Sequence, residues 1–214
     1  DSFLYSRIIP AEINLTSDSA VIFLNGTNGS SYFEDNQLTY YGGSLIGDPR
    51  MGLAEEGYAL TIVNKSANEK NFVCKFSTLY WESLLLTFAR RFTGTGFSSY
   101  QIKWSSDGTI FHPITTINIP KTAQGVFELQ TVNLQNYYQM NRRDSVFLSI
   151  SVDSATSARG NVRLDNIAFM DKNVLKQLYS LILFILEYLI IVMDSIFQKL
   201  LTLGIQSYQG KIVF

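Results

Sequence analysis

Apolar residues at alternate positions are the clearest pattern before residue 172 of the chain. In the best example, four apolar residues occupy every second position of one segment: Val146, Leu148, Ile150 and Val152. This period of two residues predicts a strand with one buried and one hydrated face. Similar segments, each bounded by turn-forming residues, predict further strands, and the full set is Ala20–Leu24, Gln37–Tyr41, Tyr58–Asn64, Asn71–Ser77, Ser83–Arg91, Ser99–Ser105, Ile110–Ile117, Val126–Leu134, Ser145–Asp153 and Asn161–Phe169.

Local irregularities refine this prediction. Asp107-Gly108 lies between two predicted strands, and an Asp-Gly pair supplies the positive φ angles of a tight hairpin turn. In two strands the apolar positions move from one face to the other, which is what a β-bulge produces. The residues on either side of these phase changes are Phe127 and Leu129 against Val132 and Leu134, and Val162 and Leu164 against Ile167 and Phe169.

The fold class follows from the number and spacing of the strands. No helical period is visible before residue 172, and many short strands at even spacing are typical of antiparallel β folds. We therefore predict an all-β domain over residues 1–171, a two-sheet antiparallel β-sandwich of the jelly-roll type. A second region, residues 172–214, is an apolar C-terminal tail that is helical if it is ordered.

The tail differs sharply from the body in composition. Its segment Val174–Leu203 is dominated by Leu and Ile, with few charged residues. A helix that covers a core is one interpretation, and a membrane anchor is another, because a span needs about 20 apolar residues. Glu187 opposes the anchor, since a carboxylate in the middle of a span is costly. Of these two interpretations, we therefore favour a helix that covers a core over membrane contact through the tail.

Composition excludes several classes of function. The chain has 214 residues, of which 14% are aromatic, and it carries a net charge of −1. That charge gives no basic face for nucleic acid. The single cysteine, Cys74, excludes an intrachain disulfide and a zinc site of several cysteines, and the single histidine, His112, excludes two-histidine metal motifs.

Catalytic residues are not apparent in the sequence. A serine triad would have to use His112, and the chain has no Gly-x-Ser-x-Gly elbow. Cys74 lies in a strand pattern and is better explained as a small buried hydrophobic residue. Two carboxylates suffice for glycoside hydrolysis, so a hydrolase fragment stays as a minor alternative. We expect a protein that is not an enzyme.

Candidate binding residues are aromatic and basic. Trp81, Tyr100, Tyr137 and Tyr138 lie at or near predicted loops, where a flat ring can stack on a sugar, although core packing is the alternative role. Arg90, with Arg91 and Arg163, is a candidate clamp for a polar or anionic ligand; a solvated strand face or an ion pair is the alternative.

A metal site is the remaining candidate. Asp165-Asn166 lies at the phase change of the last strand, where an oxygen-rich calcium site is one interpretation. A bulge whose side chains bond the local backbone is the other. Calcium is therefore a candidate cofactor, with Asp165 as its ligand, and no other cofactor is expected.

Three blocks of sequence occur in a characteristic order: Leu84–Phe97, with its Thr-Gly-Thr-Gly-Phe end, Ile102–Phe111, and Val146–Phe169, with its Gly-Asn-Val-Arg-Leu-Asp-Asn run. Together they resemble the jelly-roll, galactose-binding-like modules of secreted bacterial proteins that carry a type IX secretion sorting tail. At Ser154 the family usually has glycine. The resemblance implies a secreted or cell-surface location and a non-catalytic binding or adhesion role. The implied partner is a carbohydrate or a cell-surface polysaccharide; a structural spacer in a larger surface protein is the alternative.

The resemblance also offers a third interpretation of the tail. The sorting domain opens with Leu-Tyr-Pro-Asn-Pro and carries a Tyr-x-x-x-Gly-Lys-x-Val strand near its end, while this chain has Leu178-Tyr179 and ends Gly210-Lys-Ile-Val-Phe214. Codons for Pro-Asn-Pro-Phe, read one nucleotide late, encode Leu-Ile-Leu-Phe, the sequence of Leu181–Phe184. The tail is then a frameshift-derived remnant of a sorting domain. The first residue is Asp1, so we expect a processed or cut chain, for which removal of a secretory signal is one cause.

Overall fold

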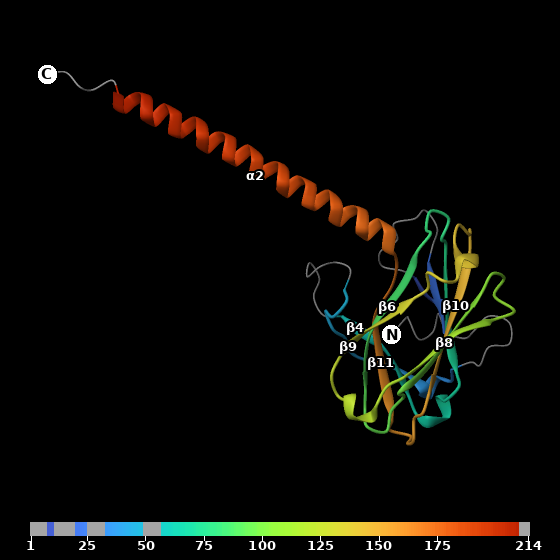
Figure 1. The fold of residues 1–214 in the computed structure, drawn as a ribbon. Coiled ribbons are helices and arrows are strands. Elements are labelled where there is room, and N and C mark those ends of the chain that lie inside the picture. The colour runs from blue at the N-terminus through green and yellow to red at the C-terminus, as the bar shows by residue number, and fades with distance from the viewer. Residues whose placement is uncertain (1–7, 11–19, 25–32, 49–56, 210–214) are drawn as a thin grey trace. The chain divides into compact units, whose positions relative to one another are not determined.

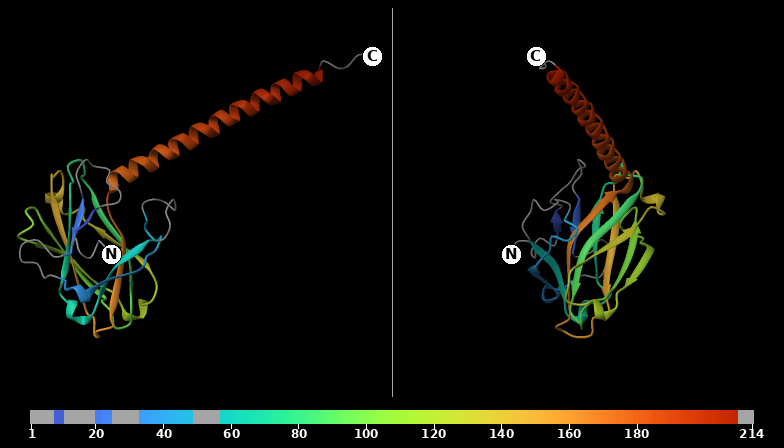
Figure 2. Two further views of the ribbon diagram at one scale, coloured as in Figure 1. Left: turned by 180° about the vertical axis from the view of Figure 1, so that it is seen from behind. Right: turned by 60° about the vertical axis from the view of Figure 1, so that its left-hand side comes forward.

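The computed structural model describes residues 8–10, 20–24, 33–48 and 57–209 (Figure 1). The chain divides into two compact units, Asp1–Asp171 and Lys172–Phe214. The first unit is a sandwich of two antiparallel sheets, so the predicted fold class is confirmed (Figure 2). Its strands are β1 (Ile8–Pro10), β2 (Val21–Phe23), β3 (Leu38–Gly42), β4 (Tyr58–Val63), β5 (Asn71–Phe76), β6 (Leu84–Phe92), β7 (Ser99–Ser105), β8 (His112–Asn118), β9 (Glu128–Asn133), β10 (Val146–Asp153) and β11 (Asn161–Asp171).

The connections cross repeatedly between the sheets, as in a jelly roll. Sheet A has the order β1-β2-β5-β10-β7-β8, and sheet B has the order β3-β4-β11-β6-β9. Every strand pairing among the described residues is antiparallel, including those of the central strands β10 and β11. Strands far apart in sequence are therefore neighbours, and loops from different parts of the chain meet at each end of the sandwich.

The core lies between the sheets and is built by the period-two pattern. All four apolar residues of the best sequence example are buried, as Val146, Leu148, Ile150 and Val152 have relative exposures of 1% or less. Facing them from sheet B are the alternate residues of β6, which include Leu84, Leu86, Phe88 and Phe92. Burial of this apolar area, at roughly 25 cal/mol per Å², is the main stabilising term.

One of the two predicted bulges is present. The register between β11 and β6 shifts between Asp165 and Ala168, and Asn166 has a φ of 49° there. The other prediction is wrong, because β9 pairs with β6 without a shift. Val132 faces the core, whereas Leu129 lies on the outer face of sheet B, where it meets the loop after β3 at Gly47. A regular strand with apolar residues on both faces shows the same change of apolar phase in its sequence as a strand with a bulge.

The structure differs from the sequence prediction at two further places, strand β1 and the hairpin between β7 and β8. Strand β1 was not anticipated, since three residues are too few for a period to show. The predicted hairpin joins β7 to β8, but its loop is longer than a two-residue turn. There Gly108 has a φ of 75°, and the Asp107 carboxylate accepts hydrogen bonds from the backbone N–H groups of Thr109 and Ile110.

Two of the three family-like blocks, the first and the last, meet at one end of the sandwich. Gly96 and Gly160 are in such close contact with the opposite loop that a Cβ atom on either would lie 2.1 Å from a backbone carbonyl oxygen. The Thr93 N–H also donates to the Asn161 carbonyl at 3.1 Å. These motif residues therefore hold two loops together. A structural role explains their pattern, so the motifs by themselves do not locate a ligand.

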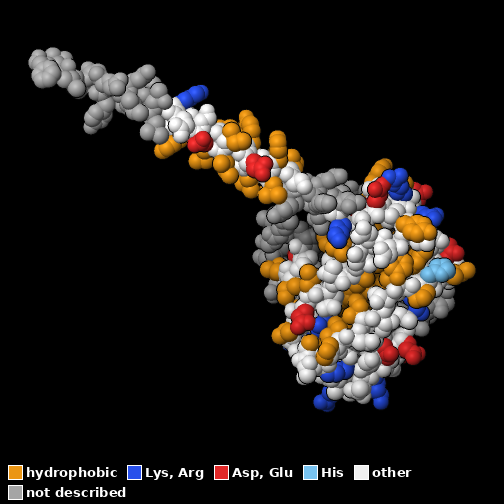
Figure 3. Space-filling view, viewed as in Figure 1, with side chains coloured by type: hydrophobic (Ala, Val, Ile, Leu, Met, Phe, Trp, Pro, Cys, Tyr) orange, Lys and Arg blue, Asp and Glu red, His pale blue; other side chains and the backbone are white. Residues whose placement is uncertain are grey.

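The second unit is helix α2 (Lys172–Gln209), as expected for an ordered tail. Its segment Ser180–Leu200 has 21 residues, a mean hydropathy of 2.2 and no burial, so by length and composition it could cross a membrane. Figure 3 shows apolar side chains along this part of the helix, with charged side chains among them. In a helix, Glu187 and Asp194 are seven residues apart and lie on the same face.

Candidate functional site

Two loops at one end of the sandwich bring three of the predicted aromatic residues together. The loop between β5 and β6 carries Tyr80 and Trp81, and the loop between β9 and β10 carries Tyr137 and Tyr138. We call these four residues the aromatic end. The predicted residues Trp81, Tyr137 and Tyr138 thus lie on two loops that hydrogen bonds join, although more than 50 residues separate the loops in the sequence.

Hydrogen bonds lock the two loops to each other. The Thr78 N–H donates to the Arg143 carbonyl at 2.8 Å, and the Arg142 N–H donates to the Thr78 carbonyl at 3.0 Å. The Thr78 hydroxyl adds a bond to the Met140 carbonyl, and the Arg142 guanidinium forms an ion pair with Glu82. A ligand that touches both loops therefore meets a surface that is already ordered, which reduces the entropy lost on binding.

The four aromatic side chains divide into two exposed and two anchored ones. Tyr80 and Tyr138 are 77% and 71% exposed. Trp81 packs partly buried against the core, with its ring centroid 6.4 Å from that of Phe76. Tyr137 is also partly buried, and its hydroxyl donates to the Ile114 carbonyl of β8 at 2.8 Å. Trp81 and Tyr137 thus fix the loop positions from which Tyr80 and Tyr138 project.

Two predicted binding residues lie in the interior instead of on the surface, which corrects the expectation. Tyr100 is 0% exposed, and its hydroxyl donates to the Phe97 carbonyl at 3.1 Å. Arg90 is 1% exposed; it forms an ion pair with Glu128 and donates to the Ala123 carbonyl at 3.2 Å. Both residues occupy core-facing positions of their strands, so neither is available to a ligand in the folded chain.

The outer face of sheet B presents a different polar surface. Arg163 of β11 and Arg91 of β6 are paired directly across the two strands, and the Arg163 guanidinium carbon lies 4.6 Å from the centroid of the Tyr41 ring. We call Tyr41, Arg91 and Arg163 the arginine face. Burial and the neighbouring Arg91 both lower the pKa of Arg163, while Tyr41 acts in the opposite direction. Tyr41 itself is 45% exposed.

A loop borders the arginine face. After β3 the chain crosses the outer side of sheet B, where Asn166 donates from its side-chain amide to the carbonyls of Ser44 and Ile46. The Ser44 N–H donates to Asp165 at 2.7 Å. Leu45 and Ile46 remain exposed on this loop. The bulge residues thus hold a loop beside the two arginines.

The oxygen atoms of Asp165 are engaged with the backbone. One accepts from Ser44 and the other from the Asn166 N–H at 3.0 Å, which is the arrangement expected of a bulge with local hydrogen bonds. Within the described ranges, no cluster of three or more His, Cys, Asp or Glu residues could hold a metal ion. The role of Asp165 as a calcium ligand therefore stays a prediction.

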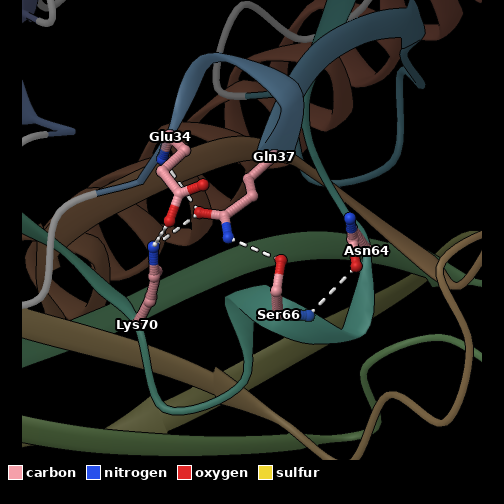
Figure 4. A network of polar contacts seen from close by, with 5 residues as sticks. All are labelled: Glu34, Gln37, Asn64, Ser66 and Lys70. Carbon is pink, nitrogen blue, oxygen red and sulfur yellow. Dashed lines mark hydrogen bonds and ion pairs between the residues drawn. The ribbon is translucent and has the colours of Figure 1, made fainter.

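A second group of side-chain oxygen atoms, those of Glu34 and Gln37, binds the ammonium group of Lys70. In Figure 4, the Lys70 ammonium donates to Glu34 at 3.2 Å and to the Gln37 side-chain oxygen at 2.8 Å. Gln37, which is fully buried, also donates to the Ser66 hydroxyl at 2.8 Å. This network ties the 3₁₀ turns Asp35–Gln37 and Lys65–Ala67 together and supports the fold.

The potential catalytic groups occupy structural positions. Cys74 is buried, and burial raises the pKa of its thiol to about 12, so it is not a nucleophile near neutral pH. His112 is exposed at the start of β8, beside the Trp104 ring at a centroid distance of 5.6 Å. The burial of Cys74 agrees with the interpretation that the sequence favoured for this residue.

The sequence did not indicate Tyr41, and it did not separate the exposed Tyr80 and Tyr138 from their partly buried neighbours Trp81 and Tyr137. The alternation rule did contain part of the signal, because adjacent residues of a strand point to opposite faces. Arg90 and Arg91 must therefore separate, and so must Tyr40 and Tyr41. Which member faces the core depends on the register of the whole sheet.

Comparison with known proteins gives structural neighbours but no family. No protein-family model matches the sequence, and no curated protein is significantly similar to it. Among solved structures, the xylan-binding module CBM15 is 10% identical (77% of this chain, 96% of that one, TM-score 0.43). A CBM4 structure is 12% identical (75% and 93%, TM-score 0.42), and TmCBM61 in complex with β-1,4-galactotriose is 11% identical (63% and 88%, TM-score 0.37). With TM-scores below 0.5, these likenesses carry no argument about this chain.

Proposed function

We propose that the sandwich is a non-catalytic carbohydrate-binding module that binds sugar rings at the aromatic end. The observation that carries this proposal is the presence of two exposed tyrosines, Tyr80 and Tyr138, on loops that hydrogen bonds lock together. Tyrosine combines a flat apolar ring with a polar hydroxyl, which suits the apolar faces and hydroxyl groups of a sugar. The proposal rests on the surface of this chain.

The surroundings of the two tyrosines also suit a sugar. Next to Tyr138 in the loop are polar side chains, and the Asn141 amide donates to the Glu82 carbonyl at 2.7 Å. The Arg142–Glu82 ion pair is exposed on the same loops. Sugar hydroxyls can replace water on such groups, while the rings supply apolar contact area. The sequence resemblance to secreted modules supports a role in adhesion to polysaccharides outside the cell.

The test is a binding screen of the full chain on a panel of polysaccharides, with and without a chelator. We expect Tyr80→Ala and Tyr138→Ala each to weaken binding by about three- to tenfold, because an aromatic contact contributes roughly 0.5–1.5 kcal/mol. Tyr58→Ala is the matched control, since Tyr58 is 80% exposed but lies on β4 next to Tyr40. Loss of binding with the chelator would add a metal ion to the site.

Two results would contradict the proposal. One is equal binding by the wild type and the Tyr80→Ala/Tyr138→Ala double variant. The other is a folded wild-type chain that binds no member of the panel, and this would favour the alternative of a structural spacer.

A further inference from the structure

The two arginines of the arginine face stand opposite each other on neighbouring strands. Arg91 and Arg163 are paired in register, and side chains at such positions have Cβ atoms about 5 Å apart. Like charges at directly opposed positions destabilise a sheet. A pair of this kind therefore calls for a compensating negative charge.

Among the described residues, neither arginine has an acidic partner within ion-pair distance, whereas Arg90, Lys70 and Arg142 each have one. Asp165 lies two residues from Arg163, but its oxygens accept the Ser44 and Asn166 N–H groups. The Arg163 guanidinium donates to a neutral carbonyl, that of Gly42, at 3.3 Å.

Tyr41 holds one of the two guanidinium groups in place. The Arg163 guanidinium lies over the Tyr41 ring at 4.6 Å, and the Gly42 carbonyl fixes its orientation. A guanidinium held in this way loses less entropy when it binds a ligand. On the far side of Arg163 from Arg91 the same cross-strand row continues with Thr61, which is buried and uncharged.

We propose that the arginine face binds the carboxylate groups of an acidic polysaccharide, with one uronate carboxylate held between Arg91 and Arg163. The planar fork of a guanidinium matches a carboxylate with two parallel hydrogen bonds. The half-exposed Tyr41 ring provides an apolar surface for the sugar that bears the carboxylate. This inference rests on the proposed carbohydrate-binding function and assigns the chain a preference for uronic acids at a second surface.

Charge decides between this ligand and a nucleic acid. A phosphodiester chain binds through many basic contacts spread over a face, and the whole chain has a net charge of −1. Two paired arginines beside one aromatic ring form a local site for a single anionic group. An acidic sugar residue within a longer polysaccharide has that size and chemistry.

Binding of polygalacturonate to the full chain at low ionic strength tests the proposal. The matched ligand is fully methyl-esterified polygalacturonate, which has the same sugar backbone without the charge. We expect wild-type protein to bind the acid form, and Arg91→Gln and Arg163→Gln each to weaken that binding by at least roughly tenfold, a typical loss for a charge-assisted hydrogen bond. Arg159→Gln is the control, because Arg159 is exposed on the loop between β10 and β11, and it should change binding by less than about twofold.

The thermal transition of each variant shows whether it is folded. Arg91→Gln removes a charge from a repulsive pair and should therefore fold. This variant keeps the test valid if Arg163→Gln does not fold. Equal binding of the acid and ester forms, or wild-type affinity in Arg91→Gln, would overturn the proposal. Tighter binding of dextran sulfate than of polygalacturonate would also overturn it, in favour of sulfate esters.

The same assay separates this proposal from the proposed function. If Tyr80→Ala/Tyr138→Ala leaves neutral-sugar binding intact while Arg91→Gln abolishes polygalacturonate binding, the aromatic end fails and the arginine face stands. If neutral sugars bind through the aromatic end and polygalacturonate does not bind at all, the arginine-face proposal alone fails.

Discussion

The two faces of sheet B use the same side chain in opposite ways. Arg90 and Arg91 are adjacent in β6, so one points into the sandwich and the other points out. Arg90 is buried with Glu128 and the Ala123 carbonyl as partners. Arg91 lies on the outer face, opposite the like-charged Arg163. The inner face pairs its charge with an acidic side chain, and among the described residues the outer face has no such pair.

This difference teaches how structural and binding roles can be distinguished. A buried charge requires partners, because an unpaired charge in the interior is very costly. An exposed charge can be left for a ligand at a small cost in stability. The same contrast holds at the aromatic end, where Trp81 and Tyr137 pack inward while Tyr80 and Tyr138 project into solvent.

The largest predicted effect is a difference in the free energy of unfolding between variants of Arg90 and Arg91. Arg90→Ala should lower the free energy of unfolding by about 2–4 kcal/mol, because it removes the packing of a buried side chain and breaks its ion pair. Arg91→Ala should change it by less than about 0.5 kcal/mol. Urea denaturation of both variants and the wild type measures the difference. A greater loss in Arg91→Ala would invert the comparison.

A second effect, which grows by about 1.4 kcal/mol per pH unit, should appear at alkaline pH. Burial raises the pKa of Cys74 to about 12 in the folded chain, against 9.0 for the free thiol. Above pH 9 the unfolded chain releases the thiol proton and the folded chain keeps it, so stability falls as pH rises. The stability difference between the wild type and Cys74→Ala should therefore shrink between pH 9 and pH 12. A difference independent of pH would show that the thiol is accessible to water.

The smallest effect concerns a residue on neither face. Ser154, where the resembling family has glycine, has a φ of 73° and lies in the loop between β10 and β11. Glycine adopts this conformation without strain, so Ser154→Gly should stabilise the sandwich by roughly 1 kcal/mol and leave polysaccharide binding unchanged. Ser106→Gly, at an exposed position without positive φ, should not stabilise it. A rise in melting temperature for both variants or for neither would contradict this account of the loop.

The strands were predictable because their signal is local. Ten of the eleven strands in the described part of the chain overlap the predicted segments, and the shift at Asp165 was visible as a change of phase. Pairing between distant strands carries no such local signal. The failed prediction of a bulge at Leu129 shows the limit, because the outer face is apolar there only where the loop after β3 crosses it.

The candidate site was predictable only in part. Trp81, Tyr137 and Tyr138 were named from their position near loops, but the sequence did not show that hydrogen bonds from Thr78 would bring those loops together. Tyr100 and Arg90 were named as candidate binding residues, but the register of β7 and β6 turns both inward, as in their alternative roles of core packing and an ion pair. The exposure of a side chain depends on which set of alternate residues in its strand faces the other sheet. The packing of the whole sandwich determines that choice.

Hydrogen exchange with and without a bound oligosaccharide tests the central claim most directly. The chain would be saturated with an oligosaccharide derived from the best neutral ligand of the panel, and amide exchange would be measured across the described strands and loops. The account predicts slower exchange at residues 78–83 and 137–143, with β3, β4 and the core strands unchanged. Protection elsewhere on the sandwich, with none in these two loops, would contradict the claim that the aromatic end is the sugar-binding site.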